Sequence, residues 1–171
     1  MILRRLTPED ATVYRELRLL ALADFPAAFM SSVEEEGAES LEWFAARLSP
    51  HNDTTMVGAF EEQTLVGMVG FGRNSRRKTR HTGFIRSMFV MSAWRKHGVG
   101  LALLTEAMNA LRQFGGLRQV YLEVLSGNTA AVALYQRVGF MQYGIQPDAL
   151  CVDGEFYDDM LMHLSLAAGG K

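Results

Sequence analysis

An apolar run, a basic turn with two glycines and a helical pattern follow one another near the middle of this chain, and this order constrains the fold most strongly. The run covers residues 84–91, and the turn reads Arg95-Lys96-His97-Gly98-Val99-Gly100. The helical pattern has its apolar positions at Leu104, Met108, Leu111 and Phe114. A strand that turns directly into a helix aims unpaired N–H groups and the positive end of the helix dipole at one point. Because glycines also let the backbone approach a ligand closely, this order predicts a phosphate-binding turn.

The turn fits neither of the two commonest phosphate-binding motifs. A Walker-type loop needs Lys and Ser or Thr after its glycines, but Leu101 and Ala102 follow Gly100 here. A dinucleotide fingerprint needs a third glycine at 103, where Leu stands. On these residues alone, a surface turn that only begins a helix remains the alternative.

Length and composition limit the class of protein. With 171 residues the chain has the size of one domain, and we expect residues 1–166 to form it and 167–171 to be a disordered tail. The net charge of −2 gives no general attraction to nucleic acid or to an anionic membrane. A single cysteine, Cys151, excludes an intrachain disulfide. Since no apolar leader or membrane-spanning run is evident, we expect a cytoplasmic protein.

The remaining patterns predict an α/β (α+β) domain. Helices are expected from Thr7 to about Pro26, from about Ser40 to Leu48, after Gly100, and over 129–138. Strands are expected over 2–6, 54–60, 64–71, 84–91, 120–125, 140–152 and 156–166. The pair Asp153-Gly154 indicates a tight turn between the last two strands. This order predicts a mixed sheet flanked by helices.

Four segments in the second half of the chain together resemble the GNAT superfamily of acetyl-CoA-dependent N-acetyltransferases. They are residues 88–90, the turn 95–100, residues 122–124 and residues 128–140. The turn resembles the family's Arg/Gln-x-x-Gly-x-Gly/Ala motif. Residues 128–140 look like its Asn-x-x-Ala-x-x-Leu-Tyr-x-x-x-Gly-Phe ending.

The resemblance implies a single-domain fold with a mostly antiparallel sheet of about seven strands, a central splayed parallel pair and about four flanking helices. It also implies that acetyl-CoA is the co-substrate: the turn would hold its diphosphate, and the strand before the turn would pair with its pantetheine arm. The residues expected to bind the coenzyme are Met88, Phe89, Val90, Arg95, Lys96, His97, Gly98, Val99, Gly100, Asn128, Ala131 and Tyr135.

Two residues are candidates for the acid and the base of the reaction. The resemblance places Tyr135 beside the thioester sulfur, where it would protonate the departing thiolate; a core tyrosine is the alternative. Glu123 lies in an apolar strand and resembles the acid of the family's ribosomal-protein alanine N-acetyltransferases. It would deprotonate the amine, with a water relay or a plain surface position for Glu123 as the alternatives. A backbone N–H near Phe89 or Val90 would stabilise the oxyanion.

The sequence indicates the acceptor-binding residues less clearly than the coenzyme-binding residues. Phe29, Met30 and Tyr157 are candidate substrate residues, although core packing explains them equally well. The basic run Arg73–Arg80 could bind an acidic substrate, the ribose phosphate of the coenzyme, or only water. The four histidines show no ligand spacing, so no metal is expected.

We therefore expect an N-acetyltransferase that moves the acetyl group of acetyl-CoA to a primary amine by direct attack in a ternary complex. The acceptor would be an amino acid, a peptide N-terminus or another small amine. A non-catalytic acyl-CoA-binding or sensing domain of the same fold is the alternative. Nucleic acid and membrane are not expected as partners, and a homodimer is possible.

Overall fold

The computed structural model describes residues 1–49 and 54–166. Seven strands form one sheet in the order β1-β2-β3-β4-β5-β7-β6. They are β1 (Ile2–Arg5), β2 (Thr54–Glu61), β3 (Thr64–Arg73), β4 (Thr82–Val90), β5 (Gln119–Leu125), β6 (Met141–Val152) and β7 (Glu155–Ser165). The helices are α1 (Ala11–Asp24), α2 (Val33–Gly37), α3 (Leu41–Arg47), α4 (Val99–Arg112) and α5 (Thr129–Val138). The tail predicted over 167–171 lies outside the described residues.

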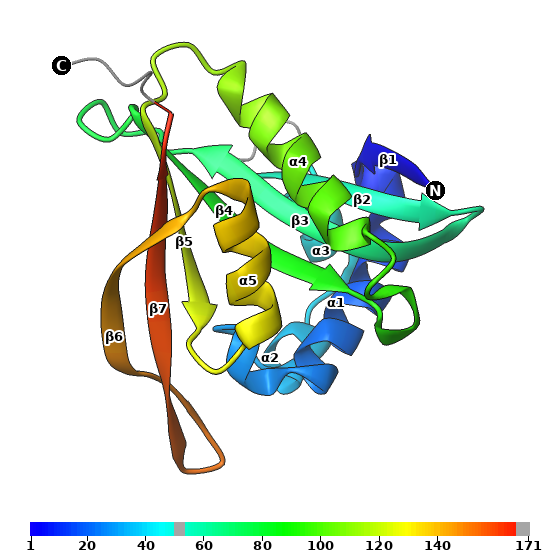
Figure 1. The fold of residues 1–171 in the computed structure, drawn as a ribbon. Coiled ribbons are helices and arrows are strands. Elements are labelled where there is room, and N and C mark those ends of the chain that lie inside the picture. The colour runs from blue at the N-terminus through cyan, green and yellow to red at the C-terminus, as the bar shows by residue number, and fades with distance from the viewer. Residues whose placement is uncertain (50–53, 167–171) are drawn as a thin grey trace, which may run out of the picture.

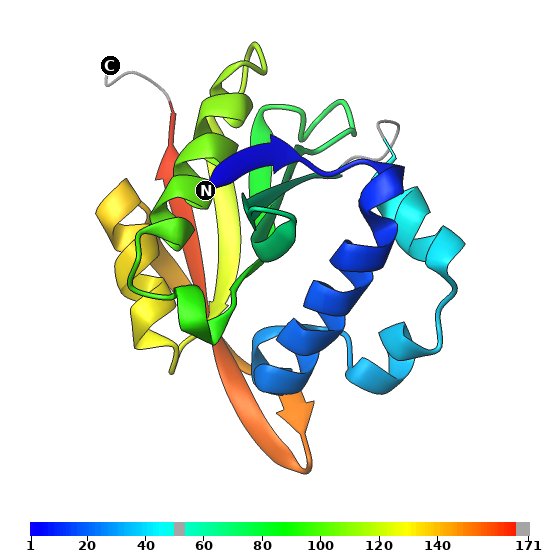
Figure 2. The ribbon, with the colours of Figure 1, turned by 90° about the vertical axis from the view of Figure 1, so that its right-hand side faces the viewer.

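Helices cover both faces of the sheet (Figures 1 and 2). α4 and α5 pack on one face over a core that includes Leu104, Val120 and Met162. α1 and α3 pack on the other face over a second core that includes Tyr14 and Phe44. Two apolar layers therefore fix the sheet from opposite sides, and successive side chains along a central strand point to opposite faces of the sheet.

The predicted fold class is confirmed: the sheet is mixed, with one parallel pair, β4–β5, among the described strands. The Asp153–Gly154 turn joins β6 and β7, with φ angles of 52° and 84°. Such positive values suit the Asp-Gly pair of a tight hairpin.

The structure differs from the prediction in two details. A short helix, α2, precedes α3; Ser32 begins it, and the Ser32 hydroxyl accepts a hydrogen bond from the Glu35 N–H at 3.2 Å. Phe114, expected on the inner face of α4, is 38% exposed, because α4 ends at Arg112 and the chain has already turned away.

Candidate active site

The central feature of the site is a fork between β4 and β5. The two strands pair at only three positions, Thr82–Gln119, Gly83–Val120 and Phe84–Tyr121. β4 then continues to Val90 along β3, and β5 continues to Leu125 along β7. The fork therefore opens toward the C-terminal ends of both strands (Figure 1).

A β-bulge shapes the β4 arm of the fork. Met68 pairs with Phe89 and Gly70 with Arg86, so that Ser87 and Met88 together stand opposite the single residue between them on β3. Ser87 takes a φ of 53°. A bulge bends its strand and redirects the backbone groups that follow, here those of Phe89 and Val90.

The register of β4 decides which backbone groups face the fork. Met91 donates its N–H to the Val66 carbonyl at 3.0 Å, so Gly67 and Val90 form a non-hydrogen-bonded pair of the antiparallel ladder. The backbone N–H and C=O of Val90 consequently point away from β3, into the fork. Phe89 pairs with Met68 and directs its N–H toward β3. Of the two expected oxyanion donors, the register favours Val90.

The turn at 95–100 leads from β4 into α4. Gly98 precedes the helix with a φ of 80°, and a Cβ placed there would meet no atom within 4 Å. The left-handed backbone, rather than lack of space, therefore explains the glycine. Among the described residues no side chain caps α4, and the helical bonding begins with the Ala102 N–H on the Gly98 carbonyl at 3.0 Å. The N–H groups of residues 99–101 are left for an anion, which fits a diphosphate.

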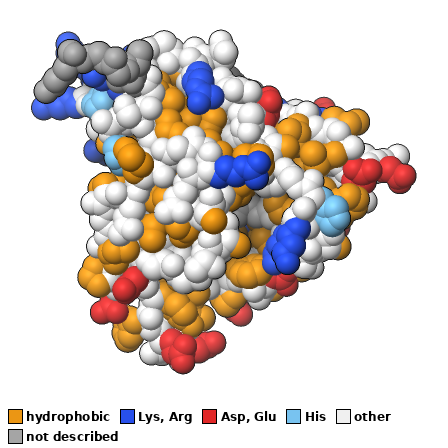
Figure 3. Space-filling view, viewed as in Figure 1, with side chains coloured by type: hydrophobic (Ala, Val, Ile, Leu, Met, Phe, Trp, Pro, Cys, Tyr) orange, Lys and Arg blue, Asp and Glu red, His pale blue; other side chains and the backbone are white. Residues whose placement is uncertain are grey.

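The surface is hollowed beside this turn. Figure 3 shows the hollow between α5 and the start of α4, with basic side chains next to it. Gly100 allows the helices to approach here, since a Cβ would lie only 3.2 Å from Leu134 Cδ2 and 3.5 Å from Met88 Cε. Val99 is buried and can offer only its backbone.

The Arg95 side chain connects the turn to β4. Its Nε donates a hydrogen bond to the Val90 carbonyl at 2.9 Å, and its guanidinium lies 4.6 Å from the centre of the Phe25 ring. His97 follows, with Nδ1 at 2.7 Å from the Arg95 carbonyl. Arg95 thus anchors the turn to β4 through its side chain, whereas contacts of Arg95, Lys96 and His97 with the coenzyme remain predictions.

Asn128 begins α5 at the open end of the fork. Its Oδ1 accepts a hydrogen bond from the Ala131 N–H at 3.1 Å, a helix-capping arrangement. Ala131 also packs against the core under α4 and α5. Both residues therefore have structural roles, and their contact with the coenzyme remains a prediction.

Tyr135 reaches β4 from the α5 side of the sheet. The side chain is buried at 7% exposure, and its hydroxyl donates to Met88 Sδ at 3.6 Å. Burial raises the pKa of Tyr135 to about 12. The phenol therefore stays protonated at physiological pH and is available as a hydrogen-bond donor beside the bulge.

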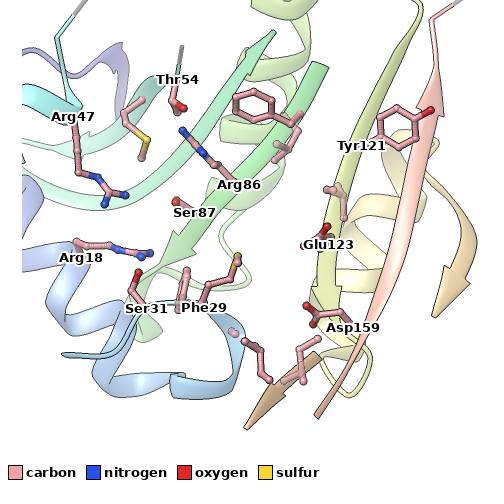
Figure 4. Close-up of a pocket in the computed structure, with 18 of the residues that line it drawn as sticks. Arg18, Phe29, Ser31, Arg47, Thr54, Arg86, Ser87, Tyr121, Glu123 and Asp159 are labelled. Atoms are coloured by element: carbon pink, nitrogen blue, oxygen red, sulfur yellow. The ribbon is translucent and has the colours of Figure 1, made fainter. Parts of the chain in front are cut away.

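A cleft of about 620 Å³ opens on the opposite face of the sheet (Figure 4). Residues 84–87 of β4 and the side chains of Tyr121 and Glu123 on β5 form its floor. Val120, Leu122 and Val124 point into the core on the other face, so alternation along β5 turns Glu123 toward the cleft. Glu123 and Tyr135 thus approach the fork from opposite faces of the sheet.

Asp159 is a second cleft carboxylate, which the sequence reasoning missed. It stands on β7 opposite Leu125 and diagonally across from Glu123, on the same face of the sheet. Burial, together with the charge of Glu123, raises the pKa of Asp159. The signal was present in the alternation of β7, because Met160, Met162 and Leu164 pack on the α4–α5 core and leave Asp159 on the cleft face.

Two of the three predicted substrate residues line the cleft, and the third does not. Phe29 and Met30 line the cleft from the segment after α1, and Met30 is 86% exposed. Tyr157 lies outside the cleft lining: it belongs to the end of the β6–β7 hairpin, where its hydroxyl donates to Glu155 at 3.1 Å. Its strand partner Leu150 does line the cleft, and a contact of Tyr157 with the substrate stays a prediction.

Arginines line the wall of the cleft across from the carboxylates (Figure 4). Arg18 of α1 is 4% exposed and forms a double hydrogen bond with Glu36, from Nε at 2.9 Å and from Nη2 at 2.7 Å. Burial opposes ionisation of Glu36, but Arg18 and the nearby Arg47 outweigh it and lower the pKa of Glu36. Arg47 Nη1 lies 3.6 Å from Glu36 Oε1, and Arg86 of β4 lines the same wall.

The basic run Arg73–Arg80 lies at the other end of β4 from the turn at 95–100 (Figure 1). The nine residues of β4 separate the two by roughly 25–30 Å at about 3.3 Å per residue. This placement does not support a contact with the coenzyme's phosphates. Within residues 1–49 and 54–166, no group of three or more His, Cys, Asp or Glu could hold a metal ion. None of the helices described has the length and hydropathy to cross a membrane.

The comparison with known families identifies the class of protein. The description "Acetyltransferase (GNAT) family" matches residues 14–140. This chain belongs to that family. By its description, that family consists of acetyltransferases.

Individual relatives share part of their length with the chain. N-alpha-acetyltransferase RimI of Mycobacterium tuberculosis is 40% identical over 98 residues, which are 57% of this chain and 58% of that protein. The chain thus spans less than two thirds of this relative. The putative phosphinothricin acetyltransferase YwnH of Bacillus subtilis is 26% identical over 70% of this chain and 72% of its own length.

Solved structures share the whole fold. A GNAT-family acetyltransferase from Streptococcus pneumoniae superimposes with a TM-score of 0.84 at 26% identity, over 96% of this chain and 99% of that one. The putative acetyltransferase yncA from Salmonella typhimurium, solved with its cofactor acetyl-CoA, has a TM-score of 0.79 at 22% identity, covering 100% and 96%.

Proposed function

We propose that this acetyltransferase moves the acetyl group to a primary amine that enters from the cleft, by direct attack within the β4–β5 fork. The observation that carries the proposal is the placement of Glu123 and Tyr135 on opposite faces of the sheet, with the backbone of Val90 turned into the fork between them. An amine from one face and a thioester from the other would meet there.

On the donor side, the uncapped start of α4 would bind the diphosphate of acetyl-CoA, and the β4 backbone would pair with the pantetheine arm. The carbonyl of Val90 is already bonded to Arg95, so the Val90 N–H is the group left for the substrate. It would donate to the acetyl oxygen and stabilise the negative charge that develops there.

On the acceptor side, Glu123 and Asp159 would attract the ammonium form of the amine and remove its proton. The neutral nitrogen then attacks the thioester carbon, and the C–N bond forms. As the C–S bond breaks, the Tyr135 hydroxyl would protonate the thiolate of coenzyme A. The attacking nitrogen would give up its second proton to water, and this release balances the proton that Tyr135 takes back from solvent. A water relay from Glu123 remains compatible with this scheme.

Two-substrate kinetics test the proposal. Thiol release is measured while acetyl-CoA and the amine are varied together, across a panel of amino acids, peptides and simple amines. Direct attack in a ternary complex predicts intersecting double-reciprocal lines. Parallel lines would indicate a covalent acetyl-enzyme and overturn the mechanism.

The alternative, a non-catalytic acyl-CoA-binding domain, finds no support in the comparisons. It predicts acetyl-CoA binding by calorimetry without thiol release for any member of the panel. The cytoplasmic location, the homodimer and the domain boundary at residue 166 stay predictions.

A further inference from the structure

Two buried donors on α1 lack partners at the cleft. The Arg18 Nη1 and the Tyr14 hydroxyl are closed to water and have no hydrogen-bond partner in the structure. They lie four residues apart on α1, on the same face of the helix, and both residues line the cleft. Leaving buried donors unsatisfied is unfavourable, so two such groups side by side call for an explanation.

The Arg18 guanidinium is held in a fixed position. Glu36 binds its Nε and Nη2, and the Phe29 ring lies beneath it with the centre 4.8 Å from the guanidinium carbon. These contacts use two of its three nitrogens and one of its faces. The third nitrogen, Nη1, is thereby positioned in advance for a group that accepts hydrogen bonds.

The two sides of the cleft carry side chains of opposite charge. Figure 4 shows Arg18 and Arg86 on one side and Glu123 and Asp159 on the other. A cation is favoured beside the carboxylates, and an anion beside the arginines. A volume of about 620 Å³ suits a small molecule that reaches both sides.

We infer that the acceptor carries a carboxylate as well as its amine, in the manner of an amino acid. The amine faces Glu123 and Asp159, and the carboxylate oxygens accept hydrogen bonds from Arg18 Nη1 and the Tyr14 hydroxyl. Both unpartnered groups are donors, and a carboxylate offers two acceptor oxygens without any proton of its own. This inference rests on the proposed function, since it names the acceptor class of the same site.

Matched acceptor pairs test the inference. Methionine and glutamate are compared with their α-amides and with dipeptides that begin with the same residues, using thiol release by the full chain with acetyl-CoA. The inference predicts that kcat/KM for each free amino acid exceeds that for its amide by about ten- to a hundredfold, as expected for hydrogen bonds to a charged group. Equal or better turnover of the amides or dipeptides would overturn it and leave the proposed function standing. No thiol release with any acceptor would instead overturn the proposed function, and this inference with it.

Tyr14→Phe supplies the decisive variant, because it removes only the hydroxyl of a side chain that otherwise packs edge-on against Phe44. The ratio of kcat/KM for the free amino acid to kcat/KM for its amide should fall about tenfold, because only the value for the free amino acid decreases. An unchanged ratio would show that the hydroxyl meets no carboxylate. Tyr143→Phe is the control, since it removes a hydroxyl from the β6 side of the cleft and should keep the ratio.

Arg18 needs a variant that can still fold. Arg18→Met alone would leave the Glu36 charge buried, so it is combined with Glu36→Leu, which replaces the whole ion pair by apolar side chains. The double variant should lose the preference for the acid and keep turnover of the amide. Retention of the full preference in this folded variant would contradict the role of Arg18.

Discussion

Asp159 of β7 lies diagonally across from Glu123 of β5, and burial of Asp159 together with the charge of Glu123 raises the pKa of Asp159. The two carboxylates belong to the same cleft. They also provide a negative surface where an ammonium group has to bind and lose a proton.

The first prediction concerns this pair. In Glu123→Gln the charge that raises the Asp159 pKa is gone, so the acidic limb of kcat against pH should move to lower pH. The value of kcat should also fall about a hundredfold if Glu123 is the base. Asp159→Asn, on the neighbouring strand, is the matched variant with which Glu123→Gln is compared. An unaltered pH profile in Glu123→Gln would show that water or another carboxylate, not Glu123, removes the proton of the amine.

Tyr135→Phe tests the donor side. The substitution removes the hydroxyl that contacts Met88 and leaves the buried ring in place. Calorimetric affinity for acetyl-CoA should stay within about twofold, whereas kcat should fall by about ten- to a hundredfold. Because the pKa of Tyr135 is about 12, its own titration should not appear in the profile below about pH 11. Equal turnover in variant and parent would remove Tyr135 from the mechanism.

Gly98→Asp tests the diphosphate turn. An aspartate there places a negative charge at the uncapped start of α4 and strains a φ of 80°. The affinity for acetyl-CoA should fall by about tenfold or more. Gly116→Asp is the control, since Gly116 has nearly the same φ, 79°, beyond the far end of α4. Equal losses of affinity in both variants would attribute the effect to backbone strain.

Glu36→Gln tests the buried ion pair. It leaves the Arg18 charge in the interior without its carboxylate, so the free energy of unfolding should drop by about 3–5 kcal/mol in urea denaturation. Asp10→Asn, at the exposed Arg4–Asp10 pair, should cost about 1 kcal/mol or less. Similar losses in the two variants would argue against a special role for burial.

The same pair predicts how stability depends on pH. The Glu36 pKa is lowered in the folded state from the ordinary 4.5. Its contribution is therefore complete above pH 4.5 and is lost as the pH falls through the lower folded value. Glu36→Gln should accordingly flatten the decline of stability below pH 4.5, and an identical decline in the parent would contradict this assignment.

Sequence patterns predicted the sheet and the local structure around the 95–100 turn well, because these depend on local rules. Gly98 is required by a left-handed backbone, Asn128 caps a helix, and β-strand alternation accounts for the cores. The family resemblance then supplied a role for these positions, which local rules alone could not.

The acceptor half depended on contacts between distant segments. Arg18 and Glu36 are 18 positions apart and read as surface charges, yet α2 folds back and buries them together. Asp159 becomes a cleft residue only because β7 pairs with β5. The local sequence pattern predicts neither the pairing of these strands nor the resulting burial.

The most direct test of the account is a crystal structure of the chain with acetyl-CoA. We expect the diphosphate at the N–H groups of residues 99–101 and the acetyl oxygen within about 2.7–3.1 Å of the Val90 nitrogen. The sulfur should lie beside the Tyr135 hydroxyl. An acetyl group bound away from the fork, with Val90 bonded to protein instead, would contradict the account.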